Sequence, residues 1–180
     1  MDLKSSHGHI LHNFAAKYKI TQLMITITNK TLLESMLANL KPDTVPAFGT
    51  MTPQHMIEHL IDTVRFSNGV HPQELLSLTD AAEQLKQFFI YSDSELPTGV
   101  KSPLLPSEGL APLKQPNLAA AITQLVDELA AFDLYFQQNP SMSPINPFMG
   151  ALKHDEWITF HNKHFGHHFK QFHLFEASSL

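Results

Sequence analysis

Two histidines near the C-terminus are spaced so that both can bind one metal ion. His164 and His168 are four residues apart, and side chains at positions i and i+4 of a helix are neighbours, about 5 to 6 Å apart at Cβ. Neutral imidazole is a common ligand of zinc and other divalent transition metals. If this segment is helical, the pair supplies two of the three or more ligands that such a site needs.

The same segment carries its histidines on the face that aromatic residues mark as inward. A helical wheel of about 100° per residue places five side chains within about 80° of one another: Trp157, His161, His164, His168 and Gln171. Phe160, Phe165 and Phe172 flank this strip. A buried imidazole loses hydration and needs partners for its ring nitrogens, so several on one inner strip indicate a shared metal ion.

The third ligand is expected from an earlier segment that also carries paired histidines. His55 and His59 form another i, i+4 pair, and the wheel puts His59 nearer than His55 to the apolar stripe of that segment. We therefore predict that His59, His164 and His168 are the metal ligands. Three neutral imidazoles with an open position are typical of a catalytic site rather than a closed structural one.

Three further residues are predicted to support the ligands from outside. His161 shares the strip, but three ligands from one helix cannot easily surround one ion, so a hydrogen bond beside the ligands or a substitute role is expected. Asp62, one turn after His59, could orient its imidazole or be an ordinary solvated carboxylate. Gln171, at the end of the strip, is the third of these residues.

A rival pattern overlaps the second segment. His55-Met56-Ile57-Glu58-His59 matches the His-x-x-Glu-His signature of inverted zinc proteases, in which both histidines bind zinc and the glutamate is the general base. So short a pattern arises readily in a chain with twelve histidines, and it leaves the strip near the C-terminus unexplained. The other histidines are expected to be ordinary surface residues or part of a solvated arm, namely His71, His154, His173, His7, His9 and His12.

Prolines, glycines and capping residues divide the chain into the elements that must position these side chains. Helices are predicted at 31–40, 52–69, 116–139 and 155–173 from apolar spacing and from Thr52-Pro53 and Pro116-Asn117, which are typical helix starts. Residues 71–89 are compatible with a helix. Residues 92–115 contain four prolines and are predicted to be a long crossover, and 141–150 a second proline-broken loop.

These elements predict one all-α domain. The fold class is a four-helix bundle with one long crossover between the second and third helices, spanning residues 31–180. Residues 1–30 form an N-terminal arm that stays unassigned, since residues 24–29 alternate like a strand and 9–18 could be helical.

Composition narrows the function classes. The chain has no cysteine, which excludes disulfides, thiolate nucleophiles and cysteine-type metal sites. A net charge of −5, with no dense basic cluster, argues against nucleic acid as a partner. No apolar run approaches the roughly 20 residues of a membrane span, and the N-terminus lacks a secretory signal. The expectation is a soluble cytoplasmic protein, with a homodimer left open.

Two stretches carry a resemblance to a known family. MTPQHMIEHLIDTVRF and NPFMGALKHDEWITFHNKHFGHHFKQF resemble the second helix and the closing segment of the DinB and YfiT-like superfamily of metal-dependent four-helix bundles, especially a branch of uncharacterised function. There the histidine before leucine and two histidines of a His-x-x-His-His-x-x-Gln run bind the metal, which implies His59, His164 and His168. The likeness covers roughly residues 33–172. Lys153 departs from it, since the branch has a threonine cap there.

The resemblance also implies an activity. Members of the superfamily are similar to thiol transferases that use bacillithiol or mycothiol and to a maleylpyruvate isomerase. The leading expectation is therefore a transferase that uses one divalent ion, zinc or nickel, to present a small thiol to an electrophilic substrate. The alternatives are a hydrolase using metal-bound hydroxide and a non-catalytic, metal-stabilised binding module.

Overall fold

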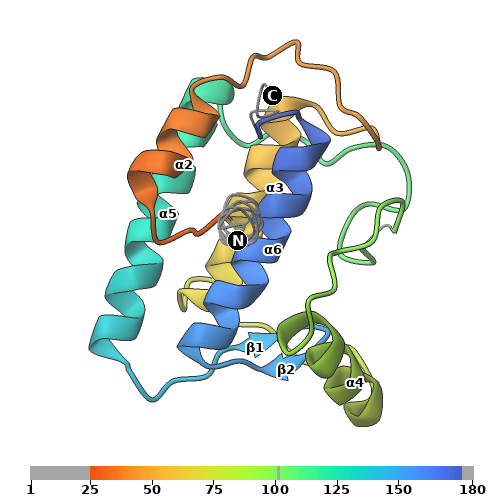
Figure 1. The fold of residues 1–180 in the computed structure, drawn as a ribbon, viewed down its shortest axis with the longest axis vertical. Helices are drawn as coiled ribbons and strands as arrows, with labels where there is room; N and C mark the ends of the chain where they lie inside the picture. Colours follow the sequence, from red (N-terminus) through yellow and green to blue (C-terminus); the bar gives the residue numbers. More distant parts are fainter. Residues whose placement is uncertain (1–24, 101, 176–180) are drawn as a thin grey trace, which may run out of the picture.

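A computed structural model describes residues 25–100 and 102–175 of the chain, and these residues are mostly helical (Figure 1). Five helices and a two-stranded antiparallel sheet are present in this part of the chain: α2 (Lys30–Leu37), α3 (Pro53–Ser67), α4 (Thr79–Ile90), α5 (Leu118–Gln138), β1 (Ile145–Asn146), β2 (Gly150–Ala151) and α6 (His154–Gln171). None of the helices in the described residues combines the length and apolar character needed to cross a membrane.

The two helices with the clearest start signals begin where the sequence predicts. Pro53 occupies the first turn of α3, and the Thr52 side chain accepts a hydrogen bond from the His55 backbone N–H. At the start of α5, the Asn117 side chain accepts from the Ala120 N–H. Both side chains satisfy backbone donors that the first turn of a helix leaves without partners.

A carboxylate supplies the cap of α6 that Lys153 cannot. The Lys153 backbone N–H donates to Glu156 Oε2 at 2.7 Å, and a negative charge is favourable at a helix N-terminus. The departure from threonine at this position therefore leaves the start of α6 intact. Glu156 is buried, and it also binds Lys86 Nζ at 2.9 Å and the Tyr91 hydroxyl, which ties α4 to α6.

Four of the helices correspond to the four that the sequence predicts. α3 packs against both α5 and α6, and α2 packs against α5 (Figure 1). The largest fully buried side chains come from these four helices and the segment after α6, and they include Trp157, Phe132, Phe165, Phe169, Phe172, Met56, Leu60, Leu125 and Leu129. The apolar faces thus meet in one core, with α3 and α6 in direct contact.

The structure differs from the predicted four main helices in two places. α4 is a fifth helix, within the helix-compatible stretch 71–89 and before the predicted crossover, and it contacts α6 and β2 at one end of the domain (Figure 1). The predicted loop 141–150 contains β1. This strand pairs with β2, and Asn146 lies opposite Gly150. Asn146 Oδ1 accepts from the backbone N–H groups of Phe148 and Met149, which closes the turn.

Two segments are helical over fewer residues than the sequence allows. The helix-compatible stretch 71–89 is helical only from Thr79, since the Leu76 N–H donates to the Pro147 carbonyl at 2.8 Å. The first helix ends at Leu37 rather than at residue 40. After its end, the Leu40 N–H donates a hydrogen bond to the Leu37 carbonyl.

Residues 25–29 form no strand, and the Ile27 N–H donates to Asn162 Oδ1 on α6 at 2.8 Å. The possible helix 9–18 and His7, His9 and His12 lie outside the described residues.

Candidate metal centre

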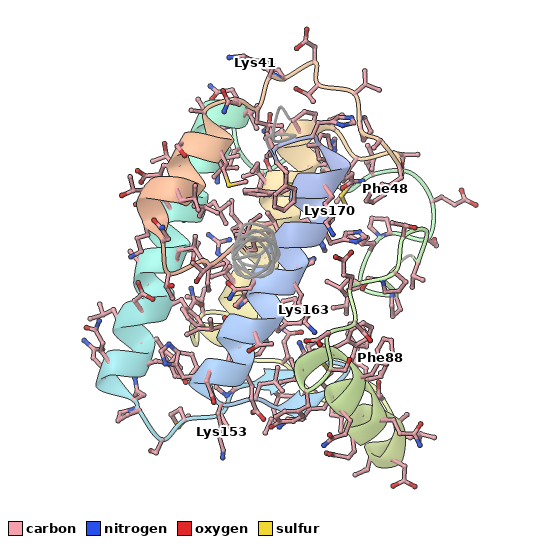
Figure 2. All side chains as sticks on the ribbon, in the orientation of Figure 1. Lys41, Phe48, Phe88, Lys153, Lys163 and Lys170 are labelled. Carbon is pink, nitrogen blue, oxygen red and sulfur yellow. The ribbon has the colours of Figure 1, made fainter. Side chains whose placement is uncertain are left out.

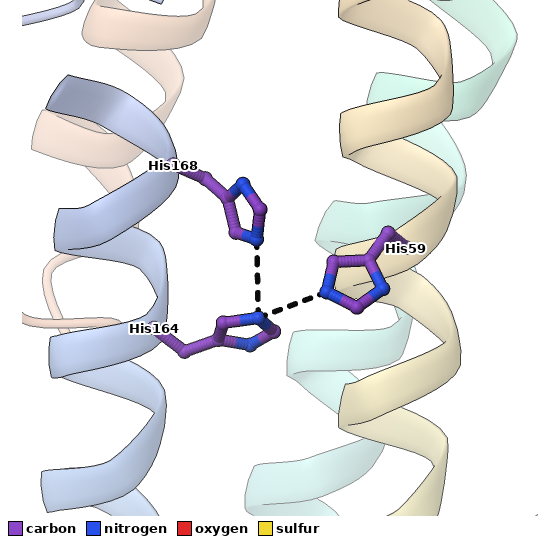
Figure 3. A group of neighbouring side chains, drawn as sticks. All are labelled: His59, His164 and His168. Carbon is purple, nitrogen blue, oxygen red and sulfur yellow. Dashed lines mark hydrogen bonds between the residues drawn. The ribbon is translucent and has the colours of Figure 1, made fainter. Parts of the chain in front are cut away.

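The imidazoles of His59, His164 and His168 meet between α3 and α6 (Figure 3). His164 Nε2 lies 3.0 Å from His59 Nε2 and 3.2 Å from His168 Nε2. His164 and His168 are buried, and His59 is partly exposed. The i, i+4 pair on α6 and one histidine of the pair on α3 are therefore brought together as predicted.

Two of the distances among these nitrogens are close to those around a metal ion, and all three ligand atoms lie within 4.8 Å of one another. Zinc binds imidazole nitrogen at about 2.0–2.1 Å in a tetrahedral arrangement, which puts two ligand nitrogens about 3.3–3.4 Å apart. The two shorter Nε2 distances are within a few tenths of an ångström of this value, so a small outward movement of the rings accommodates the ion. Among the described residues no carboxylate or further histidine joins the group.

A bound cation explains the close approach of these three nitrogens better than hydrogen bonds between the rings do. A ring nitrogen of neutral imidazole carries either one hydrogen or one lone pair. His164 Nε2 therefore cannot form good hydrogen bonds to both neighbours at once. A cation at the centre would accept the lone pairs of all three nitrogens, which is the chemistry that this donor set favours.

Burial keeps the three imidazoles of the cluster neutral. Burial lowers the pKa of His59 to about 4, although the carboxylate of Asp62 opposes part of this effect. Burial, with the nearby His59 adding to it, lowers the pKa of His168 to about 3. The pKa of His164 is also well below its ordinary value, first because of burial and then because of its histidine neighbours. Neutral imidazole is the form that binds metal.

Different contacts hold the two histidines of the cluster that lie on α6. His168 Nδ1 lies 2.8 Å from Gln171 Oε1, so Gln171 contacts a predicted ligand directly, and its supporting role in metal binding stays a prediction. The His164 ring stacks on Phe160, with centroids 5.5 Å apart, and its Nδ1 is buried without a hydrogen-bond partner among the described residues.

The other two predicted supporting residues bind elsewhere. Both carboxylate oxygens of Asp62 accept from Lys114 Nζ, at 2.7 and 2.6 Å. The effect of Asp62 on His59 is therefore electrostatic, and a hydrogen bond that orients the ring stays a prediction. His161 is fully buried, stacks on Trp157 at 5.3 Å, and has its Nε2 2.9 Å from Ser67 Oγ on α3.

His167 is a neighbour of the site that sequence reasoning missed. Its half-buried ring lies 5.1 Å from those of His168 and Phe48, and its Nδ1 lies 3.3 Å from the Leu96 carbonyl. The wheel places it about 100° from His168 and outside the inner strip. The doublet His167-His168 was the signal that could have singled it out.

The protease pattern does not assemble into a metal site. His55 Nε2 lies 3.1 Å from the Ala111 carbonyl and its Nδ1 2.6 Å from Thr52 Oγ1, so its ring is engaged away from the cluster. The buried carboxylate of Glu58 accepts from the backbone N–H groups of Lys114 and Gln115, at 2.7 and 3.0 Å. Glu58 therefore anchors the end of the long crossover to α3.

No protein-family model matches this chain. No curated protein and no solved structure matches it either. What the structure supports directly is a mostly helical domain with a buried cluster of three histidines that could hold a metal ion. His71, His154 and His173 are exposed and lie outside this cluster.

Glu58→Ala tests whether the Glu58 carboxylate anchors the end of the long crossover to α3. We expect the free energy of unfolding to fall by about 1–3 kcal/mol, because two backbone donors lose their partner, while the bound metal per chain stays unchanged. Chemical denaturation and metal analysis measure the two quantities. Asp127→Ala, which removes an exposed carboxylate on α5, is the matched control. Loss of metal from Glu58→Ala alone would instead support the protease pattern.

Proposed function

We propose that this protein is a metal-dependent transferase that delivers a small thiol to an electrophilic substrate. The observation that carries the proposal is the convergence of three Nε2 atoms, from His59, His164 and His168, with no fourth protein ligand among the described residues. Three neutral ligands and an open position are the pattern of catalytic rather than structural metal sites.

The donor set supports zinc or nickel as the ion, since imidazole suits both and hard cations prefer oxygen ligands. We also propose that the chain is a four-helix bundle of the DinB and YfiT-like type. The support is that α2, α3, α5 and α6 occur in the expected order, and that the three ligands lie where the two resembling stretches imply. This proposed fold type rests on the two stretches and on the order of the helices together.

Three neutral imidazoles leave the full charge of a bound cation uncompensated. When bound, such an ion would supply a positive charge that lowers the pKa of a nearby thiol and favours its thiolate form. The chain contains no cysteine, so the thiol must arrive on a cosubstrate. The role of His59, His164 and His168 is to hold the ion, and the two histidines on α6 are buried. The thiolate sulfur then bonds to the electrophilic carbon as the leaving group departs with its electron pair, and the thiol proton goes to solvent.

The test pairs glutathione, coenzyme A and bacillithiol separately with a chromogenic electrophile. We expect the zinc- or nickel-loaded protein to accelerate the transfer with at least one thiol. Removing the metal should lower the catalysed rate at least about 100-fold, because metal catalysis supplies several kcal/mol. His164→Ala should behave like the metal-stripped protein, and His55→Ala should behave like the unchanged protein.

Equal rates with and without metal for every thiol would contradict the transferase. Metal-dependent cleavage of a chromogenic ester in the same samples would favour the hydrolase, which activates water at the same open position. A rise in the melting temperature on adding metal, with neither activity present, would favour the binding module, since a ligand that binds only the folded state stabilises it.

A further inference from the structure

The loop between α2 and α3 lies against the C-terminal end of α6. The Ala47 N–H donates to the Gln171 carbonyl at 2.8 Å, and the Gln171 side-chain Nε2 donates to the Phe48 carbonyl at 2.7 Å. Figure 2 shows Phe48 beside the end of α6 that carries Lys170. These two bonds join residues more than 120 positions apart. They hold the loop backbone at residues 47 and 48 in contact with Gln171.

The contact with Phe48 determines which way the Gln171 amide points. A backbone carbonyl can only accept a hydrogen bond, so the atom facing Phe48 must be the amide nitrogen. The amide oxygen then faces His168 Nδ1, at 2.8 Å. An amide oxygen can only accept, so Nδ1 must carry the hydrogen of the neutral ring, and Nε2 must carry the lone pair that points into the cluster.

Gly49 is the residue that permits this close approach. A Cβ at position 49 would lie 2.9 Å from Gln171 Nε2, closer than real Cβ contacts. Gly49 also has a φ of +74°, a left-handed conformation that glycine adopts without steric cost. A side chain here would have to push the Gln171 amide away from the Phe48 carbonyl.

We propose that the Phe48-Gly49 turn is a positioning element of the metal centre, because it fixes the Gln171 amide and so holds His168 in the tautomer that binds metal. The inference rests on the proposed metal site. Hydrogen-bond partners behind ligating histidines typically change metal affinity 10- to 100-fold. The loop therefore contributes to metal binding although none of its residues is a ligand.

The first experiment compares two glycines in the full-length protein. Gly150 has the same φ of +74°, but a Cβ there would meet nothing within 4 Å. Gly49→Ala and Gly150→Ala should both lower the melting temperature through left-handed backbone strain. Only Gly49→Ala should also weaken Zn²⁺ binding, by about tenfold or more in competition with a chromogenic chelator. Gln171→Leu, which removes the acceptor without touching the backbone, should weaken it about 10- to 100-fold.

The second experiment reads the tautomer without metal. In the metal-free protein, the ¹⁵N chemical shifts of His168 should show a protonated Nδ1 and an unprotonated Nε2. In Gly49→Ala and Gln171→Leu they should move toward a mixture of tautomers, and in Gly150→Ala they should not move. Unchanged shifts and unchanged Zn²⁺ affinity in both test variants would overturn the positioning role.

The two proposals fail in different ways. If the unchanged protein binds no Zn²⁺ or Ni²⁺ at all, the proposed function fails, whatever the tautomer of His168. If the unchanged protein binds the metal and Gly49→Ala and Gln171→Leu bind it equally well, the metal site stands and the role of the Phe48-Gly49 turn is refuted.

Discussion

His164→Ala is expected to abolish stoichiometric metal binding. His164 occupies the middle of the cluster, with its Nε2 within 3.2 Å of the Nε2 atoms of both His59 and His168. The binding free energy of a protein metal site is of order 10 kcal/mol or more, so each of a few ligands accounts for several kcal/mol. Removing one should lower the affinity at least about 100-fold. His59→Ala and His168→Ala should have effects of the same order.

The control is a histidine on the same helix as His59. His55→Ala removes the same side chain, but His55 contacts Thr52 and Ala111 rather than the cluster, so metal binding should stay within about threefold of the original, since the charge and ligand set are unchanged. Elemental analysis of the purified protein gives the stoichiometry, and calorimetric titration of the stripped protein gives the affinity. Circular dichroism identifies any variant that fails to fold. Metal loss in folded His55→Ala with full retention in His164→Ala would refute the proposed ligand set.

Metal affinity is expected to stay nearly constant from pH 8 to about pH 5 and to fall steeply near pH 4. From the ordinary imidazole pKa of about 6.5 alone, acid would release the ion near neutrality. Burial changes this expectation, because it lowers the pKa of His59 to about 4 and that of His168 to about 3. Protons therefore compete with the metal for the folded site only at lower pH.

The same pKa values predict how the stability of the metal-free protein depends on pH. Below about pH 6.5, His59 and His168 take up protons in the unfolded chain, whereas in the folded protein they stay neutral down to about pH 4. The unfolded state then binds more protons, so the free energy of unfolding should fall as the pH drops from about 6.5 to 4. The buried His161, whose pKa burial lowers to about 3, contributes in the same direction.

Both effects are measured in one pH series. Competition with a chelator of known pH dependence gives the metal affinity wherever circular dichroism shows a folded protein, and urea denaturation gives the stability of the metal-free form. A tenfold loss of affinity per pH unit beginning at pH 6.5, in protein that is still folded, would mean that the ligands titrate as exposed imidazoles. Stability that stays flat between pH 6.5 and 4 would likewise contradict the burial of these rings.

Local sequence was sufficient to predict α2, α3, α5 and α6 and the inner strip of α6. Thr52-Pro53 and Asn117 set the starts of α3 and α5, because helix capping depends on residues within one turn. The strip from Trp157 to Gln171 is buried as predicted, because a helical period of 3.6 residues alone decides which side chains share a face. The i, i+4 spacing of His164 and His168 likewise needs only the helix.

Tertiary contacts decided everything that depends on how these elements approach one another. The Asp62 carboxylate binds Lys114, and residues 71–78 are held out of α4 by the hydrogen bond from Leu76 to Pro147 in the β1–β2 hairpin. No periodicity encodes such pairings, because each joins backbone or side-chain groups that are far apart in the chain. The orientation of Gln171, and with it the tautomer of His168, depends on one carbonyl of a loop before α3. The sequence by itself therefore determined which side chains face inward, and only the packed structure decided which nitrogens meet, because hydrogen bonds and metal ligands require atoms to agree to within tenths of an ångström.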